Sequence, residues 1–507
     1  MSKRFRRCAS AAVAVLGLAV AIPNPAGAAT TSTGPNTTTK PYVLPVASGV
    51  KITSLLTVDD AGSASNGYEM VGIPDGLGAR AGQGGTIDVT MNHELTATSG
   101  IVRRHGQKGA FISELTIGRN DKVSAGSDLI GPGVQYWNYL TSSYSTTPNA
   151  AGVQADGDVF PAYSAAFGRL CSASLTDPSQ LYNAATSNGY AGQLRFANEE
   201  IGNEGRTFAV DESGQAWQLP RLGLFSWENT LVAHNSSDTT LVMGQEDGPA
   251  TASELWVYVG TKQSTGTAVD KAGLTNGDDH VVDLVDESVS TDAQFRTTYG
   301  KNTPATFDLA EVDWDQSGAD QNTDSLAAGL ALNRIEDGAW DPSNPNDFYF
   351  VTTAGGNGPG GGLWKQHWND IENPELGGTL TLLLDGSEGL VSPDNVDIDT
   401  HGNLLIQEDP GNNPHVARIM AYRIADGALG TVAQFDPALF SASSPTLLTQ
   451  DEETSGIIDI EDLTGRAGTF LFDAQVHVAP TNNVAEYVER GQLMRMQVED
   501  WSAVYGS

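Results

Sequence analysis

Residues 402–411 read GNLLIQEDPG, an apolar run that ends in two acidic residues and a turn. Short apolar runs bounded by turn residues predict strands that bury one face in a core. The pattern recurs in five further stretches, each followed by a second strand-like run: residues 86–95, 192–200, 239–247, 347–356 and 468–477. The repetition predicts an all-β fold built from similar units.

Acidic residues also stand ahead of several of these strand pairs. They are Glu228, Glu336 with Asp337, Asp394 with Asn395, and Glu453. A six-bladed β-propeller with loop insertions accounts for this order, because radial repetition leaves only short, protected strand edges. The units are longer than the roughly 40–50 residues of a typical blade. We therefore expect insertions, at residues 131–193 and 262–327.

The composition narrows the class of function. The chain has 507 residues and carries 62 acidic against 27 basic side chains, a formal net charge of −35. This surplus argues against a nucleic-acid partner and against an anionic membrane surface, since both require a basic face. Helical periodicity never extends beyond about a dozen residues, which argues against a helical bundle and a doubly wound α/β fold.

The N-terminus predicts export. Residues 1–28 combine a basic start, an apolar run and three small residues before a cleavage point, as a signal peptide does. The pair Arg6 and Arg7 also allows a twin-arginine route. We expect a secreted protein with no membrane span, a signal peptide at residues 1–28, a flexible leader at 29–45 and a single propeller domain at 46–507.

The cysteines are informative because only one remains after export. Cys8 would leave with the signal peptide, so Cys171 has no partner for an internal disulfide. A lone thiol in an oxidising compartment is open to oxidation. Cys171 is therefore either a buried, inert side chain or a functional thiolate, as a metal ligand or a nucleophile.

In a ring of units, acids from different units converge at the centre. The candidates are Glu94, Glu199, Glu200, Glu246, Asp247, Glu336, Asp394, Glu408, Asp409 and Glu453. Carboxylates that lie close together raise one another's pKa, and hard cations relieve this repulsion. Calcium prefers oxygen ligands, ferric iron accepts carboxylates, and a thiolate suits a transition metal rather than calcium. The alternative is that these acids are solvated positions on a rim.

Arg334 is the candidate for binding an anion. It stands two residues before Glu336 in a strand-like run, so the two side chains share one face. A guanidinium is a bidentate partner for phosphate, and bound cations would let an acidic protein accept that anion. The alternative is a structural ion pair with Glu336 or Asp337.

Three weaker patterns remain. Residues 313–324 follow most of an EF-hand calcium loop but lack its final glutamate and a preceding helix. Residues 356–361 match GxGxxG but join two strands, which argues against a dinucleotide site. His93 and His477 stand at strand tips, where each is either a ligand or a hydrogen-bonded polar group.

A series of motifs, in order from about residue 50 to the end, resembles the PhoX-type alkaline phosphatases, the DUF839 group. The motifs are LCSASL, FANEEIGNEGRTFAV, LPRLGLFSWEN, LWVYVGTK, NRIEDGAWDP, SPDN with GNLLIQED, and ETSGII with FLFDAQVH. The resemblance implies a six-bladed propeller with iron and calcium ions on its axis. It also implies hydrolysis of phosphate esters outside the cytoplasm.

Site residues follow from the resemblance by position. The implied metal ligands are Cys171, Glu199, Glu200, Glu228, Glu336, Asp394, Glu453 and His477, with Gln475 as a further polar position. Arg334 and Glu336 match the Arg-x-Glu pair that binds phosphate and metal, and they are the implied catalytic residues. Ser-Ala-Ser follows Cys171 where the family has glycines, which marks a divergent branch.

We therefore predict a secreted, monomeric phosphoester hydrolase that uses calcium and ferric iron and acts on small phosphoesters. Two alternatives stay open from the sequence. One is a non-catalytic propeller stabilised by calcium, acting as a scaffold or binding module. The other is a lactonase-type propeller hydrolase with one calcium ion.

Overall fold

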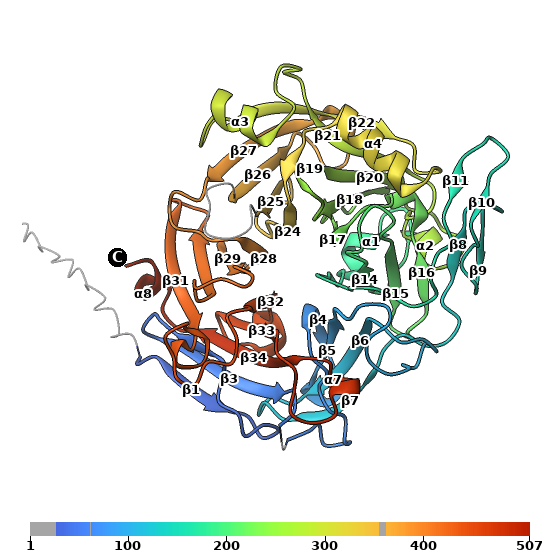
Figure 1. Ribbon diagram of the computed structural model, residues 1–507. Coiled ribbons are helices and arrows are strands. Elements are labelled where there is room, and N and C mark those ends of the chain that lie inside the picture. The colour runs from blue at the N-terminus through green and yellow to red at the C-terminus, as the bar shows by residue number, and fades with distance from the viewer. Residues whose placement is uncertain (1–26, 61, 354–360, 507) are drawn as a thin grey trace, which may run out of the picture.

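The computed structural model describes residues 27–60, 62–353 and 361–506. Strands make up most of its regular structure, and their sheets form a ring around a central axis (Figure 1). The fold is therefore nearly all-β, as predicted. The signal peptide expected at residues 1–28 lies almost entirely outside the described residues.

Five sheets of three or more strands occur in the described chain. The first has the order β1 (Thr30–Thr33), β3 (Val50–Thr57), β34 (Arg490–Val498), β33 (Thr469–Val476) and β32 (Glu452–Asp459). The second has β4 (Pro74–Ala81), β5 (Ile87–His93), β6 (Phe111–Ile117) and β7 (Val123–Asp128). The third has β14 (Leu194–Asn198), β15 (Thr207–Asp211) and β16 (Ala216–Gln218).

The two remaining large sheets complete the ring. One has nine strands in the order β17 (Trp227–Val232), β18 (Thr239–Glu246), β20 (Leu255–Thr261), β21 (Asp278–Leu284), β22 (Ala305–Val312), β27 (Gly378–Leu384), β26 (Gly362–Trp368), β25 (Asp347–Thr352) and β24 (Ile335–Trp340). The other has β2 (Val43–Pro45), β31 (Ala428–Phe435), β30 (Arg418–Arg423), β29 (Asn403–Glu408) and β28 (Pro393–Ile398).

Short strand pairs and helices fill the connections. The pairs are β8 (Tyr136–Asn138) with β9 (Ser143–Ser145), β10 (Gly152–Val153) with β11 (Val159–Phe160), β12 (Tyr182–Asn183) with β13 (Asn188–Gly189), and β19 (Ala250–Ser253) with β23 (Leu332–Asn333). The helices are α1 (Pro178–Leu181), α2 (Ala268–Lys271), α3 (Asp292–Thr298), α4 (Gly318–Ala328), α5 (Pro437–Phe440), α6 (Glu461–Thr464), α7 (Val484–Tyr487) and α8 (Trp501–Tyr505). Among these helices none has the length and apolar character needed to cross a bilayer.

All six stretches of the sequence repeat form strands, namely β5, β14, β18, β25, β29 and β33. Their predicted partners are strands as well, and each pair is antiparallel. The expected insertion at residues 262–327 is only partly an insertion. It contains β21 and β22, and β22 pairs with β27 to join two sets of strands into the nine-stranded sheet.

The two ends of the described chain close the ring. β3 pairs antiparallel with β34, so strands from near both termini lie side by side in one sheet (Figure 1). The leader expected to be flexible at residues 29–45 is ordered in two places, because β1 pairs with β3 and β2 pairs with β31. The prediction is wrong for these two segments, since both use the free edges of sheets.

Apolar faces between neighbouring sheets form the core. Phe225 stacks on Trp227 and Trp256, with ring centroids 3.9 and 4.5 Å apart. Trp364 and Trp368 are also fully buried between strands of the nine-stranded sheet. Close packing of large rings between sheets holds the inner strands at fixed positions around the axis.

We expect a chain that ends at residue 489 to lose cooperative folding. It lacks β34, which leaves the facing edges of β3 and β33 unpaired and removes the buried side chains of Met494 and Met496. Thermal unfolding by circular dichroism and gel filtration would measure the loss. The control ends at residue 500 and lacks only α8; it should keep a cooperative transition. Equal melting temperatures for the 489-residue and full chains would contradict this closing role.

Candidate metal-binding and active site

Five innermost strands of the described chain carry an acid as their second residue. These are Asp75 in β4, Glu228 in β17, Glu336 in β24, Asp394 in β28 and Glu453 in β32. In every case the register with the neighbouring strand shifts at this residue or close behind it. Such bulges bend a strand and turn its side chains out of the regular alternation. The acids therefore stand at one end of the axis rather than along it.

Residues 170–176 take the corresponding inner place beside β14. Leu170 and Leu175 form antiparallel bridges with the two ends of that strand region, so Cys171 occupies the second position where the other inner strands have an acid. The segment also lies tightly against β4, because a Cβ at Gly76 would stand 2.2 Å from its backbone. The sequence does not reveal that this segment is equivalent to the inner strands, because the segment is not a regular strand.

The side chains at these positions form one continuous set of candidate ligands. Three groups have ligand atoms that all lie within 4.8 Å of one another: Asp75 with Glu94 and Cys171, Cys171 with Glu200 and Glu228, and Glu228 with Glu336 and Asp394. Shared members link the groups. The structure thus brings together Cys171, Glu200, Glu228, Glu336 and Asp394 of the predicted ligands.

Burial and mutual repulsion raise the pKa values of these acids. Burial raises the pKa of Glu228 well above its ordinary value, and the charges of Asp394 and Glu336 raise it further. The same two causes act on Glu336, where Asp247 is the largest source of repulsion. The pKa of Glu200 rises from 4.5 to about 8 through burial and the charge of Glu94. The protein alone does not favour full ionisation of this set.

An unpartnered oxygen shows that the set fits a cation. Oε1 of Glu228 is buried and has no hydrogen-bond partner among the described residues. A buried acceptor without a donor costs free energy, and a bound cation would satisfy this atom. Carboxylate oxygens suit calcium or ferric iron, and the thiol adds a ligand for iron but not for calcium.

Cys171 is buried, and its Sγ lies 3.5 Å from Oδ2 of Asp75. Burial raises the pKa of the thiol well above its ordinary value, and the charge of Asp75 raises it further. A thiolate at this place therefore requires a neighbouring cation. The reading of Cys171 as a free nucleophile loses support for the same reason.

Arg334 lies at the rim of the set, with 35 % of its side chain exposed. Its Nε and Nη2 each donate to Asp247 over 2.7 Å, and Nη2 lies 3.2 Å from Glu336. The ion pair expected with Glu336 is present, and Asp247 rather than Asp337 is the second partner. The backbone of Arg334 has a φ of 43°, a left-handed conformation that is uncommon for residues other than glycine.

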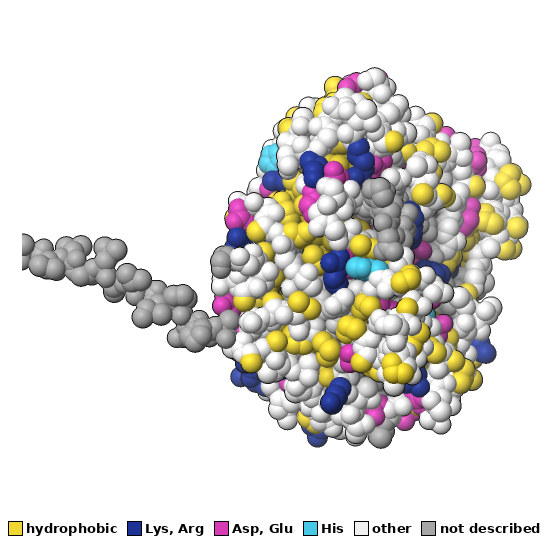
Figure 2. Space-filling model, turned by 60° about the vertical axis from the view of Figure 1, so that its left-hand side comes forward, with side chains coloured by type: hydrophobic (Ala, Val, Ile, Leu, Met, Phe, Trp, Pro, Cys, Tyr) yellow, Lys and Arg dark blue, Asp and Glu magenta, His cyan; other side chains and the backbone are white. Residues whose placement is uncertain are grey.

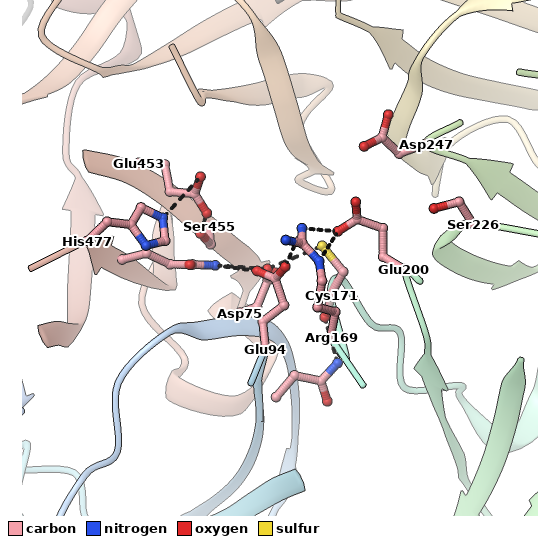
Figure 3. A network of polar contacts seen from close by, with 12 residues as sticks. Asp75, Glu94, Arg169, Cys171, Glu200, Ser226, Asp247, Glu453, Ser455 and His477 are labelled. Carbon is pink, nitrogen blue, oxygen red and sulfur yellow. Dashed lines mark hydrogen bonds and ion pairs between the residues drawn. The ribbon is translucent and has the colours of Figure 1, made fainter. Parts of the chain in front are cut away.

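Arg169, which the sequence analysis did not select, lies between Glu94 and Glu200 in the network of Figure 3. Its Nη2 lies 2.6 Å from Oε1 of Glu94 and also contacts Glu200. Its φ of 40° and its place two residues before Cys171 match those of Arg334 before Glu336. Arg-x-Cys and Arg-x-Glu are thus equivalent, a signal that a sequence comparison of the two stretches could have found.

Glu199 is not part of the set. Both of its carboxylate oxygens accept hydrogen bonds from Arg206, over 2.6 and 2.9 Å, and both side chains are fully buried. Glu199 and Glu200 are neighbours at the end of β14, so their side chains point to opposite sides. The structure brings Glu200 to the set and gives Glu199 a structural ion pair.

Glu453 and His477 form a separate pair at the edge of the network (Figure 3). Although burial lowers it, hydrogen bonds to Glu453 and Glu489 raise the pKa of His477 to about 11. Without a metal ion, His477 therefore favours the protonated form beside Glu453, and its predicted role as a metal ligand stays a prediction. Gln475 donates to Asp75 and Glu94 over 3.1 and 3.0 Å and holds both in place.

A layer of hydrogen bonds separates the acids from the rest of the axial channel. Asn229 donates to Asp337 over 2.6 Å, and Asn395 donates to the hydroxyl of Ser172 over 3.1 Å. Beyond this layer lies a cavity of about 300 Å³, lined by the second halves of the same inner strands. The layer lies between the acids and this cavity.

Several other candidates lie elsewhere. Glu408 pairs with Arg418, and Glu246 accepts a hydrogen bond from Trp256. His93 is buried and contacts Ser113 and a backbone carbonyl. Residues 313–317 lead into α4, with Ser317 as its N-cap, and residues 318–324 are part of that helix. Most of residues 356–361 lie outside the described chain.

Asp75 is the acid that the sequence analysis missed. It stands in Ile73-Pro74-Asp75-Gly76, which parallels Ser392-Pro393-Asp394-Asn395, and both Ile73 and Ser392 have positive φ, at 49° and 42°. The proline-acid pair was the available signal. It was not used because no repeat unit had been placed before residue 86.

Comparison with known proteins supports the fold. No family model matches the sequence, and no curated protein matches it. Among solved structures, PhoX of Pseudomonas fluorescens in complex with vanadate, a transition-state analogue, is similar with a TM-score of 0.60 and 12 % identity, over 94 % of this chain and 98 % of that chain. The NanB sialidase of Streptococcus pneumoniae is similar with a TM-score of 0.34 and 8 % identity, over 87 % and 70 %.

The likeness to PhoX extends over nearly the whole of both chains, so the protein shares the overall fold of that protein. At this identity the likeness shows the fold and does not carry over any residue's role.

We expect Glu199→Gln to lower the free energy of unfolding by about 3–5 kcal/mol, because it leaves the buried Arg206 without its counter-charge. Metal content should stay at the parental level. Denaturant unfolding and metal analysis measure the two quantities. The matched variant is Glu200→Gln, which should lower metal content with a smaller loss of stability. Metal loss in Glu199→Gln without destabilisation would show that Glu199 belongs to the set.

We expect the metal-free protein to lose stability as pH rises from about 5 to about 8. The folded pKa of Glu200, about 8, lies above its ordinary 4.5, so the unfolded chain ionises first and stability falls across this window. Calcium should remove much of the fall by favouring the ionised set. Melting temperatures with chelator and with calcium test this, and Glu200→Gln should flatten the chelator curve. A metal-free melting temperature that rises over the same range would contradict the account.

Proposed function

We propose that the protein is an exported, metal-dependent hydrolase of small phosphoesters. The observation that carries the proposal is the linked set of carboxylates around Cys171, bordered by Arg169 and Arg334, on the axis of a fold shared with PhoX. Acidic ligands alone would suit a structural calcium site. Arginines at the open end supply the anion binding that a phosphoester requires.

The proposal includes a six-bladed propeller over residues 46–507, after a signal peptide at residues 1–28. In support, β4, β14 with its inner segment, β17, β24, β28 and β32 follow one another around the axis (Figure 1). The nine-stranded sheet then counts as two blades whose outer edges meet where β22 pairs with β27.

Calcium and ferric iron are the proposed cofactors. Glu228, Glu336 and Asp394 would hold one part of the cluster, and Cys171 with Glu200 would hold the adjoining part. When bound, such ions polarise phosphoryl oxygens and lower the pKa of water, which makes a nucleophile available near neutral pH.

The protein's own residues bind and orient the ester. Asp247 occupies Nε and Nη2 of Arg334 and fixes the plane of the guanidinium, so its remaining edge is directed to the phosphoryl oxygens. A rigid donor aimed at those oxygens stabilises the charge that develops on them in the transition state. The hydrogen-bonded layer below the acids keeps the ester at the open end of the axis.

We expect Glu336→Gln to lower the rate of p-nitrophenyl phosphate hydrolysis by at least about hundredfold, because it removes a charged ligand at the centre of the set. The circular dichroism spectrum should remain that of the parent. The control is Glu499→Gln, which touches only the exposed pair with Lys51 and should keep the parental rate.

If Glu336→Gln cleaves p-nitrophenyl phosphate at the parental rate, the proposed catalytic role of Glu336 is wrong. Metal analysis of the parent provides a second, independent result. Calcium without iron, together with no phosphatase activity after iron is added back, would favour a non-catalytic scaffold.

A further inference from the structure

Two arginines occupy equivalent positions on two different inner elements. Arg169 stands two residues before Cys171, and Arg334 stands two residues before Glu336, with φ values of 40° and 43°. The element between them, β17, has Ser226 at the same position. One inner strand therefore separates the two arginines around the ring.

Both arginines lie on the solvent side of the acids. Their side chains are 46 % and 35 % exposed, whereas Glu94, Glu200 and Glu336 are 7 %, 14 % and 2 % exposed. An entering anion therefore meets the guanidinium groups before the carboxylates. Their pKa values are raised by the neighbouring acids, chiefly Glu94 for Arg169 and Glu336 for Arg334, so both remain charged.

Arg169 is held as firmly as Arg334. Its backbone N–H donates to Leu95 over 2.9 Å, and its carbonyl accepts from Glu200 over 3.0 Å. Its guanidinium rests between the carboxylates of Glu94 and Glu200 (Figure 3). A fixed guanidinium loses little conformational freedom when it binds an anion, which favours affinity.

Two carboxylates, those of Glu200 and Asp247, lie between the two arginines. Arg169 contacts Glu200, Arg334 contacts Asp247, and the charges of these two carboxylates act on each other. The order is therefore guanidinium, carboxylate, carboxylate, guanidinium. This arrangement suits two separate anionic groups better than the oxygens of one.

Resting on the proposed function, we propose that the site takes phosphoesters that carry a second anionic group, with the reacting phosphate at Arg334 and the second phosphate or carboxylate at Arg169. Such a molecule contacts both guanidinium groups while the neighbouring acids keep them in position. A single phosphate would contact only one of them. Arg169 then determines specificity and does not act on the reacting atoms.

Binding of non-hydrolysable ligands tests this without relying on turnover. Isothermal titration compares propylphosphonate with propane-1,3-bisphosphonate on the metal-loaded parent. We expect the bisphosphonate to bind about tenfold more tightly, the effect of one additional charge-assisted contact. Arg169→Asn should bring the two affinities close together, since asparagine tolerates the left-handed backbone and the change adds no strain. Arg169→Lys should keep part of the preference.

Two controls separate this pair from a general charge effect and from the reaction. Arg466→Ala, an exposed arginine outside the site, should keep the full preference, and Arg334→Ala should weaken both ligands. Equal affinities on the parent, no binding of either ligand, or a preference that survives Arg169→Asn would each overturn the inference. If the parent does not hydrolyse p-nitrophenyl phosphate but still prefers the bisphosphonate, the result would contradict the proposed hydrolase activity and not this inference.

Discussion

Crowding of carboxylates at one end of the axis is the constraint on which the rest of the structure depends. Asp75, Glu228, Glu336, Asp394 and Glu453 stand at the same step of five inner strands. The bulges behind them turn these side chains together, and the layer of Asn229, Asp337 and Asn395 prevents them from spreading down the channel. Their repulsion is not relieved by movement, so it is relieved either by protonation of the carboxylates or by nearby positive charge.

The protein itself supplies positive charge to part of the set, and the pKa shifts show which acids receive it. Although burial raises it, His477 lowers the pKa of Glu453 below its ordinary value. Glu228 and Asp394 have no such partner, and their pKa values are raised by burial and by neighbouring acids. Glu228, like Cys171, is shared by two of the ligand groups, so the unbalanced negative charge lies at the centre of the candidate metal site.

Alternation of apolar residues was enough to locate the strands, because a strand that buries one face has an apolar residue at every second position. It was also enough to mark Glu228, Glu336, Asp394 and Glu453, which precede recognisable strands. It could not choose between Glu199 and Glu200, since that depends on which side chain faces Arg206. The inner position of Cys171 was out of reach because residues 170–176 gain their place from bridges to β14 rather than from a strand pattern of their own.

For an acidic protein to bind an anion, positive charge within the site must outweigh the negative net charge of the whole protein. On the face shown in Figure 2, the lysine and arginine side chains of the described residues are interspersed with acidic ones and form no continuous basic surface. Long-range attraction therefore contributes little to capture of an anion, and solvent ions screen it over about 8–10 Å. Affinity must come from contacts made within the site. In the proposed function, the two arginines beside the buried acids would make these contacts, because Glu94, Glu200 and Asp247 hold their guanidinium groups in position.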